Sequence, residues 1–262
     1  MNGGLVLALI LLYSSLPAFA VFIWFRAAGY PFSVVRFLLI LLIGAAAYFP
    51  ALIMQSFFPR DFFIAGRLGL IAQIFLPIAF PEELSRLIIL LIFFYVVRKI
   101  DRAKNADMGF SLNSVDGTTP PASTTGARVT AGYGIAIFGS AAGLIAGFGF
   151  ALLESTAYGA ANTGVALLRL FTAAPIHGAC GARTGSAAAL FPTHPVQGLF
   201  RFITAVIIHG IFNFMVQIPG IASYAAVFIA LFSLASVIIS IRGGMKSLVK
   251  STSATQTPEN IT

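Results

Sequence analysis

Residues 80–86 read Phe80-Pro81-Glu82-Glu83-Leu84-Ser85-Arg86. This stretch puts two adjacent carboxylates and a guanidinium group inside an apolar run that extends from Leu68 to Val97. Ionised groups at bilayer depth cost about 3 kcal/mol each on insertion scales, so they are seldom there without a role. Three other apolar segments each carry one ionisable group near the midpoint, namely Glu154, His177 and His209. The pattern predicts that the four segments bring these groups together in one buried polar site near the bilayer midplane.

The composition is typical of a multi-span membrane protein. The 262 residues are 58% hydrophobic and only 9% charged, whereas soluble domains are about 25% charged. The net charge is +8. In a membrane protein, the distribution of lysine and arginine among the loops indicates the orientation of the chain in the membrane. We therefore expect the lipid bilayer, and not nucleic acid, to be a partner. The single cysteine, Cys180, excludes an intramolecular disulfide.

A membrane-crossing helix needs about 20 apolar residues, and seven segments of the sequence meet this requirement. The expected spans are residues 4–25, 34–56, 67–98, 131–158, 163–190, 197–218 and 221–242. The first span contains Ala18-Phe19-Ala20, which resembles a signal-peptide cleavage site. No lysine or arginine precedes its apolar core, and the apolar run continues to Phe25. A retained first span is therefore expected, and a cleaved signal peptide is the alternative.

Charge placement decides the number of spans and their orientation. Segment 67–98 is long enough for one tilted helix kinked at Pro81, or for two pieces that turn back. One helix, with the N-terminus outside, leaves only Arg60 and Arg67 on the outer side of the membrane. Splitting the segment would put the basic cluster 98–104 outside, against the positive-inside rule. Seven spans of a cell-membrane protein are predicted, with the C-terminus cytoplasmic, and eight spans are the alternative.

Residues 1–250 are expected to form one transmembrane domain. Within it, the polar stretch 101–128 is predicted to be a flexible cytoplasmic loop, because its centre is rich in Ser, Thr, Asn, Gly and Pro. Residues 251–262 lack apolar periodicity and are predicted to be a disordered tail. Glycine recurs at every fourth position from Gly139 to Gly147, which predicts close helix packing in lipid.

Glu82, Glu83 and Arg86 are predicted to interact on one helix. Arg86 follows Glu82 by four residues and Glu83 by three, so its guanidinium group can reach either carboxylate. Because two glutamates share one arginine, like-charge repulsion favours one ionised and one protonatable carboxylate, a pair suited to acid–base catalysis. A neutralised ion-pair cluster that only supports helix packing is the alternative.

Glu154 and His177 are ambiguous when each is taken alone. Glu154 lies in a span without a basic residue, so a partner on another helix or a metal would explain it better than isolation in lipid. His177 is followed by small residues, where a backbone or a ligand can come close. Structural hydrogen bonding is the plain alternative for both side chains.

His209 and Asn213 form a sharper pattern, because their i,i+4 spacing puts an imidazole and an amide on one helix face. Such a face suits the binding of water or a carbonyl oxygen. Carboxylates with two histidines match the ligand set of a catalytic zinc site that keeps an open position. No His-Glu-x-x-His motif occurs, so such ligands must come from separate helices. From the residues alone, the site can be described only as able to bind a divalent cation or protons.

Four short motifs occur in order along the chain. They are Glu-Glu-x-x-Arg at 82–86, Phe-x-x-x-Glu at 150–154, His-x-x-x-Gly at 177–181 and His-x-x-x-Asn at 209–213. In this order, and each in mid-span, they resemble the PrsW-type intramembrane proteases, which are relatives of the CAAX-processing and bacteriocin-processing membrane proteases. The resemblance covers about residues 67–218 and includes Arg169, eight residues before His177.

The resemblance implies a polytopic metalloprotease that hydrolyses a peptide bond of a membrane-anchored protein substrate. The implied catalytic residues are Glu82, Glu83, Arg86 and Asn213, and the implied ligands of a divalent metal, zinc by its donor set, are Glu154, His177 and His209. In the prenyl-processing relatives the first glutamate is viewed as activating water, histidine and asparagine hold the oxyanion, and a role for metal is disputed. PrsW-type proteins usually have lysine at the position of Arg86. Arginine cannot donate a proton at ordinary pH, so Arg86 is expected to anchor an ion pair or a carbonyl group.

Three other classes of function are compatible with parts of the pattern. A proton- or ion-coupled transporter would use the same groups as relays and needs a polar path to both membrane faces. A non-catalytic scaffold would keep its carboxylates more than roughly 10 Å from the histidines, beyond the range of catalytic contacts. A cysteine transpeptidase built on Cys180, Arg201 and His209 would leave the glutamate pair without a role.

Overall fold

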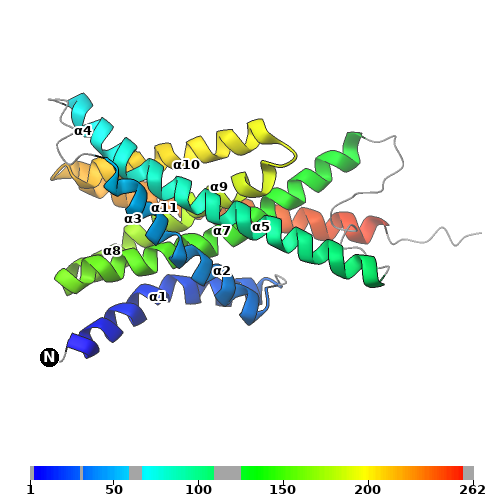
Figure 1. Ribbon diagram of the computed structural model, residues 1–262, viewed down its shortest axis with the longest axis horizontal. Coiled ribbons are helices and arrows are strands. Elements are labelled where there is room, and N and C mark those ends of the chain that lie inside the picture. Colours follow the sequence, from blue (N-terminus) through cyan, green and yellow to red (C-terminus); the bar gives the residue numbers. More distant parts are fainter. Residues whose placement is uncertain (1–2, 30–31, 59–66, 109–124, 256–262) are drawn as a thin grey trace, which may run out of the picture.

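The computed structural model describes residues 3–29, 32–58, 67–108 and 125–255, and every regular element in these ranges is helical. The predicted all-α polytopic fold is confirmed. In chain order the elements are α1 (Gly3–Ala27), α2 (Val34–Ala46), α3 (Tyr48–Ser56), α4 (Arg67–Ile74), η1 (Phe75–Ala79), α5 (Phe80–Met108), α7 (Thr125–Ala161), α8 (Thr163–Phe171), α9 (Ala173–Leu190), α10 (Pro195–Val216) and α11 (Ile221–Thr255). Most of them run roughly along the long axis of the molecule (Figure 1).

Helices α7 and α9 form the centre of the bundle. Every residue of α9 except Arg183 is buried. A Cβ atom added to Gly143 of α7 would collide with the carbonyl group of Gly181, and one added to Gly147 would collide with that of His177. The predicted close packing of small residues is therefore confirmed, and it brings the backbone at His177 directly against α7.

The other helices cover this central pair. Helices α1 and α2 pack against α7, whereas α10 and α11 pack against α9. Helix α5 contacts α9 along another face, and α3 contacts α5. The first turn of α5 consequently lies among α3, α9 and α10, which is where the polar side chains gather.

The chain from Arg67 to Met108 follows one continuous helical path, and it does not turn back into two pieces (Figure 1). Its irregularity is the π-helical turn η1, which contains Pro77 and ends two residues before Pro81. A proline ring and its missing N–H disturb the hydrogen-bond ladder of the preceding turn, and π turns are one way in which a helix absorbs that disturbance. The widened turn lies at the two prolines of this helix, and the chain continues from it into α5.

Five helical stretches among the described residues are long and apolar enough to cross a membrane, and one of them, Val34–Ser56, coincides with the predicted span. The pair α8 and α9, bent by 48°, makes a sixth if it counts as one crossing. The continuous helix 67–108 is not among them, because Glu82, Glu83 and Arg86 interrupt its apolar run. That this helix is a seventh crossing remains a prediction.

The predicted loop and tail are described only in part. Helices α5 and α7 extend into the predicted loop 101–128, whose residues 109–124 lie outside the described residues. Helix α11 extends through Thr255 into the predicted tail 251–262, and the rest of that tail also lies outside the described residues.

Candidate functional site

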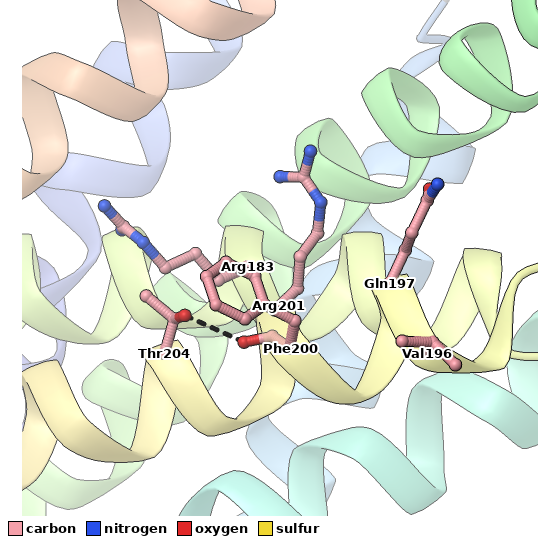
Figure 2. Close-up of a pocket in the computed structure, with 6 residues that line it drawn as sticks. All are labelled: Arg183, Val196, Gln197, Phe200, Arg201 and Thr204. Atoms are coloured by element: carbon pink, nitrogen blue, oxygen red, sulfur yellow. Dashed lines mark hydrogen bonds between the residues drawn. The ribbon is translucent and has the colours of Figure 1, made fainter.

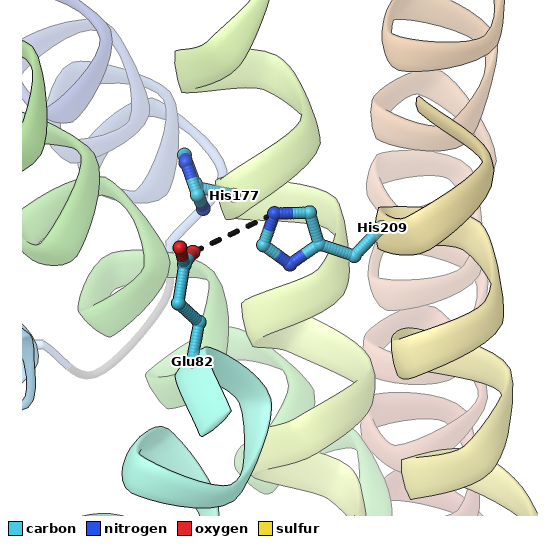
Figure 3. Close-up of side chains that lie close together, drawn as sticks. All are labelled: Glu82, His177 and His209. Carbon is cyan, nitrogen blue, oxygen red and sulfur yellow. Dashed lines mark ion pairs between the residues drawn. The ribbon is translucent and has the colours of Figure 1, made fainter. Parts of the chain in front are cut away.

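Three of the predicted side chains meet in the bundle interior. Glu82, His177 and His209 point toward one another from α5, α9 and α10 (Figure 3). One possible ligand atom from each lies within 4.8 Å of the other two. The three residues are 4%, 2% and 1% exposed, so the predicted buried polar site is present.

Glu83 is fully engaged by its neighbours. Its Oε1 accepts hydrogen bonds from Arg86 Nη2 at 2.6 Å and from His209 Nδ1 at 2.8 Å, and its Oε2 accepts one from Thr184 Oγ1 at 2.7 Å. Because a carboxylate at Nδ1 fixes the proton there, the other ring nitrogen of His209 keeps its lone pair. Glu83 therefore orients His209 and leaves Nε2 as its reactive atom.

Glu82 has a different environment although it is the adjacent residue. Its Oε1 accepts a hydrogen bond from Gln55 Nε2 of α3 at 3.2 Å. Its Oε2 is buried, has no hydrogen-bond partner among the described residues, and lies 3.6 Å from His209 Nε2. A buried carboxylate oxygen without a donor is unfavourable, so a water or a cation between Glu82 and His209 would stabilise this arrangement.

Arg86 joins three helices at the base of the site. Besides its ion pair with Glu83, it donates hydrogen bonds to the carbonyl oxygen of His177 at 3.2 Å and to that of Glu82 at 3.3 Å. Its guanidinium carbon lies 4.6 Å from the centre of the Phe150 ring of α7. It is completely buried, and these contacts are those of an ion-pair and carbonyl anchor.

His177 is held from both sides of its ring. Arg86 Nη2 donates to His177 Nδ1 at 3.3 Å, so the proton of the neutral ring lies on Nε2, which is 2.5 Å from Glu154 Oε2. The same carboxylate oxygen pairs with Arg169 of α8. The chain of contacts from Arg169 through Glu154 fixes the orientation of the His177 ring.

Glu82, His177 and His209 surround the candidate cation position, and the metal-ligand role predicted for Glu154 stays a prediction. Glu154 contacts His177 but is not one of the three residues that surround the candidate cation position. The reason is Arg169, which reaches Glu154 from the neighbouring helix and supplies the partner that its own span lacks. Asn213 lies one turn after His209 on α10, is half-buried, and makes no side-chain hydrogen bond with any described residue.

Two residues of the site were not identified from the sequence, namely Gln55 and Thr184. Both had a usable signal. Gln55 is the only amide side chain in the apolar span 34–56, and Thr184 follows His177 by seven residues, two helical turns, so both lie on one face of α9. Their partners lie on another helix, and helical periodicity within one segment does not predict contacts of that kind.

The donor chemistry of the site suits a divalent cation. One carboxylate and two imidazoles are the protein ligands of many catalytic zinc centres. The free oxygen of Glu82 and the free Nε2 of His209 are the atoms that a cation would satisfy, and Glu83 is the outer partner that orients a metal-binding histidine. The carboxylates lie 2.5–3.6 Å from the histidines. These distances are much shorter than the separation of more than roughly 10 Å that a non-catalytic scaffold would show.

Comparison with known proteins gives one match. A protein-family model described as PrsW family intramembrane metalloprotease matches residues 31–239. The matched range includes every site residue named above. No curated protein and no solved structure matches the chain.

Proposed function

The chain belongs to the PrsW family of intramembrane metalloproteases, and on that premise we propose that it hydrolyses a peptide bond of a membrane-anchored protein at the buried site. The observation that carries the proposal is the unequal glutamate pair. Glu83 holds the neutralising contacts, whereas Glu82 presents an unpartnered carboxylate oxygen 3.6 Å from His209 Nε2. A carboxylate left free beside an oriented imidazole suits the activation of water.

In the proposed reaction Glu82 is the general base. As the water oxygen bonds to the scissile carbonyl carbon, its proton passes to Glu82 and the carbonyl π electrons move onto oxygen. The amide of Asn213 donates a hydrogen bond to this oxyanion. The C–N bond then breaks, and Glu82 returns the proton to the leaving nitrogen. Arg86 transfers no proton, because its role is to hold Glu83 and the backbone at His177.

A metal is implied by the family, and we propose that His209 would hold it through Nε2 and His177 through Nδ1, in place of the contact with Arg86, with Glu82 beside them as the base. The donor set favours zinc. When bound, the cation would supply Lewis-acid polarisation of the scissile carbonyl group. Glu154 would act on the metal site indirectly, because it fixes the ring of His177.

Proteolysis measures the role of Glu82. The purified protein in lipid nanodiscs is assayed against a panel of single-span peptides with fluorophore and quencher on opposite sides of the cleavable region. We expect Glu82→Gln to lower kcat by about 10²–10⁴-fold, the range of general-base catalysis. Tyr224→Phe, on a residue of α11 that is 79% exposed, is the control with unchanged turnover. Full turnover by Glu82→Gln would refute the proposed base.

Metal content is a separate measurement of the same site. Elemental analysis is expected to give about one divalent ion per wild-type chain and a large loss in His209→Ala. His194→Ala is the matched control, because His194 lies in the turn between α9 and α10, outside the site. If wild-type protein cleaves peptides after the metal has been removed completely, the metal assignment is wrong, while the role of Glu82 stands.

A further inference from the structure

A second polar feature lies away from the buried site. A surface pocket of about 520 Å³ opens between α9 and α10. It is lined by Arg183, Val196, Gln197, Phe200, Arg201 and Thr204 (Figure 2). Its volume lies within the range of about 300–1,000 Å³ typical of small-molecule sites. The protease chemistry uses none of these residues.

Two arginines give the pocket its charge. Arg183 is held in place, since it donates to the carbonyl oxygen of Ala179 at 2.9 Å and to Ser236 Oγ of α11 at 3.3 Å. Arg201 is exposed and makes no hydrogen bond or ion pair with any described residue. Both guanidinium groups and the amide of Gln197 extend to the same side of α10 (Figure 2).

Nothing in the lining neutralises this charge, because the pocket has no acidic side chain. The Thr204 hydroxyl group is already used, since it donates to the carbonyl oxygen of Phe200 at 2.8 Å. Two like charges at one pocket repel each other, and an anion bound between them would relieve that repulsion. The donors of Arg183, Arg201 and Gln197 suit the oxygens of a phosphate group.

The pocket lies near one end of the helices that form it. Arg183 is seven residues before the end of α9, and Arg201 is six residues after the start of α10. At 1.5 Å per residue, both lie about 9–11 Å from the turn that joins the two helices. Long basic side chains at such a depth extend toward the headgroup region, so both can meet a phosphate at the membrane surface.

Apolar side chains line the rest of the pocket. Val196 and Phe200 are 80% and 72% exposed, and they belong to a helix apolar enough to cross the membrane. On a membrane-spanning helix such side chains face lipid tails. The pocket combines two arginine side chains with exposed apolar side chains. This combination suits a molecule that carries both a phosphate and an acyl chain better than it suits free phosphate.

We propose that the pocket formed by Arg183, Gln197, Phe200 and Arg201 binds the headgroup of an anionic phospholipid, whose acyl chains extend from Phe200 past the exposed Ile203 and Ile207 toward the bilayer interior. Basic pockets between transmembrane helices are known sites of lipid headgroup recognition. Under the orientation predicted from the charge distribution, this pocket faces the cytoplasmic leaflet. The proposal does not depend on proteolytic activity.

Native mass spectrometry of the detergent-solubilised full-length protein tests this proposal. The probes are dioleoylphosphatidylglycerol and dioleoylphosphatidylcholine, which have the same chains and differ in net charge. We expect one high-affinity adduct of the anionic lipid, and an affinity on the order of tenfold lower in Arg201→Gln, because one charge-assisted contact is lost. Arg36→Gln is the matched control, since Arg36 is also an exposed arginine but does not line the pocket.

Competition measurements distinguish a lipid in the pocket from a free anion or a protein segment. Displacement of the lipid by inorganic phosphate or glycerol 3-phosphate at equal concentration would assign the pocket to a free anion and overturn the lipid proposal. Preferential displacement by a hexaglutamate peptide would assign it to a protein segment. Equal affinity of both lipids, or equal loss in Arg201→Gln and Arg36→Gln, would also refute it. Unchanged thermal unfolding of Arg201→Gln in lipid-free detergent confirms that the variant is folded.

Discussion

Glu82 and Glu83 are neighbours in the chain but differ in what surrounds them. Successive residues of a helix point about 100° apart, so one carboxylate faces Thr184 and His209 and the other faces Gln55. Glu83 is saturated with donors and fixed, whereas Glu82 has one oxygen held and one oxygen free. At the residue scale, the proposed division into a positioning acid and a reacting acid rests on this difference.

Gln55 is the side chain that holds the reacting acid. In Gln55→Leu, of similar size, the hydrogen bond to Glu82 Oε1 is lost, and a bond to a charged group contributes about 1.5–3 kcal/mol. We expect kcat to fall by roughly tenfold or more while KM stays nearly constant, because Gln55 positions Glu82 and binds no substrate. Peptide-cleavage kinetics in nanodiscs measure this, with Gln217→Leu, on an exposed residue at the end of α10, as control. An effect on KM alone would contradict a positioning role.

The sequence predicted the principal residues of the site better than it predicted their partners. A glutamate or histidine in mid-span is visible because its burial is costly and demands a reason. The pairing of Glu154 with Arg169 depends on the turn at Asn162, after which the short helix α8 packs against α7. Hydropathy does not encode such a turn, so the sequence predicted a partner for Glu154 on another helix without identifying Arg169 as that partner.

At the scale of elements, the interface between α7 and α9 determines where His177 lies. Glycines on both helices let the two backbones touch, and no other residue type permits that approach. The glycine spacing was visible in the sequence. The structure shows that α9 is the helix against which the glycines of α7 pack. The π turn η1 was not predicted, because two prolines, Pro77 within the turn and Pro81 just after it, indicate a disturbed helix but not the form that the disturbance takes.

Gly143→Ala is expected to separate these two helices. The new Cβ atom would meet backbone atoms of Gly181 and Gly185, which cannot move aside as a side chain would. We expect a loss of about 1–3 kcal/mol in the free energy of unfolding, the usual cost of overpacking, and reduced peptide cleavage because His177 lies on the displaced helix. Unfolding in mixed micelles by added denaturing detergent measures the stability.

Gly243→Ala is the matched control for that experiment. Gly243 is also a helical glycine, but a Cβ atom there has nothing within 4 Å. Its substitution is expected to leave cleavage intact and to stabilise α11 by up to about 1 kcal/mol, the difference in helix propensity. Equal destabilisation by the two substitutions would contradict the role assigned to the α7–α9 contact.

At the scale of the whole molecule, the orientation of the protein in the membrane determines from which side a substrate approaches. It also determines which leaflet supplies the lipids that contact the arginine pocket. Hydropathy placed five of the predicted spans within about five residues of apolar helices that are long enough to cross a membrane, because a long apolar run has few other stable environments. The side of the membrane on which each loop lies follows from the loop charges. With the N-terminus outside, the turn between α9 and α10 is cytoplasmic and the turn between α10 and α11 is outside.

Cysteine labelling tests this orientation with little background, because the native Cys180 is fully buried. Thr193→Cys places a thiol in the turn between α9 and α10, and Gln217→Cys places one at the end of α10, both at exposed positions. A membrane-impermeant maleimide applied to intact cells is expected to label Gln217→Cys and to label Thr193→Cys only after lysis. The reverse pattern would move the arginine pocket to the outer leaflet and invert the predicted topology. Labelling of both thiols in intact cells would mean that α10 does not cross the bilayer, and the buried site could then not lie near its midplane.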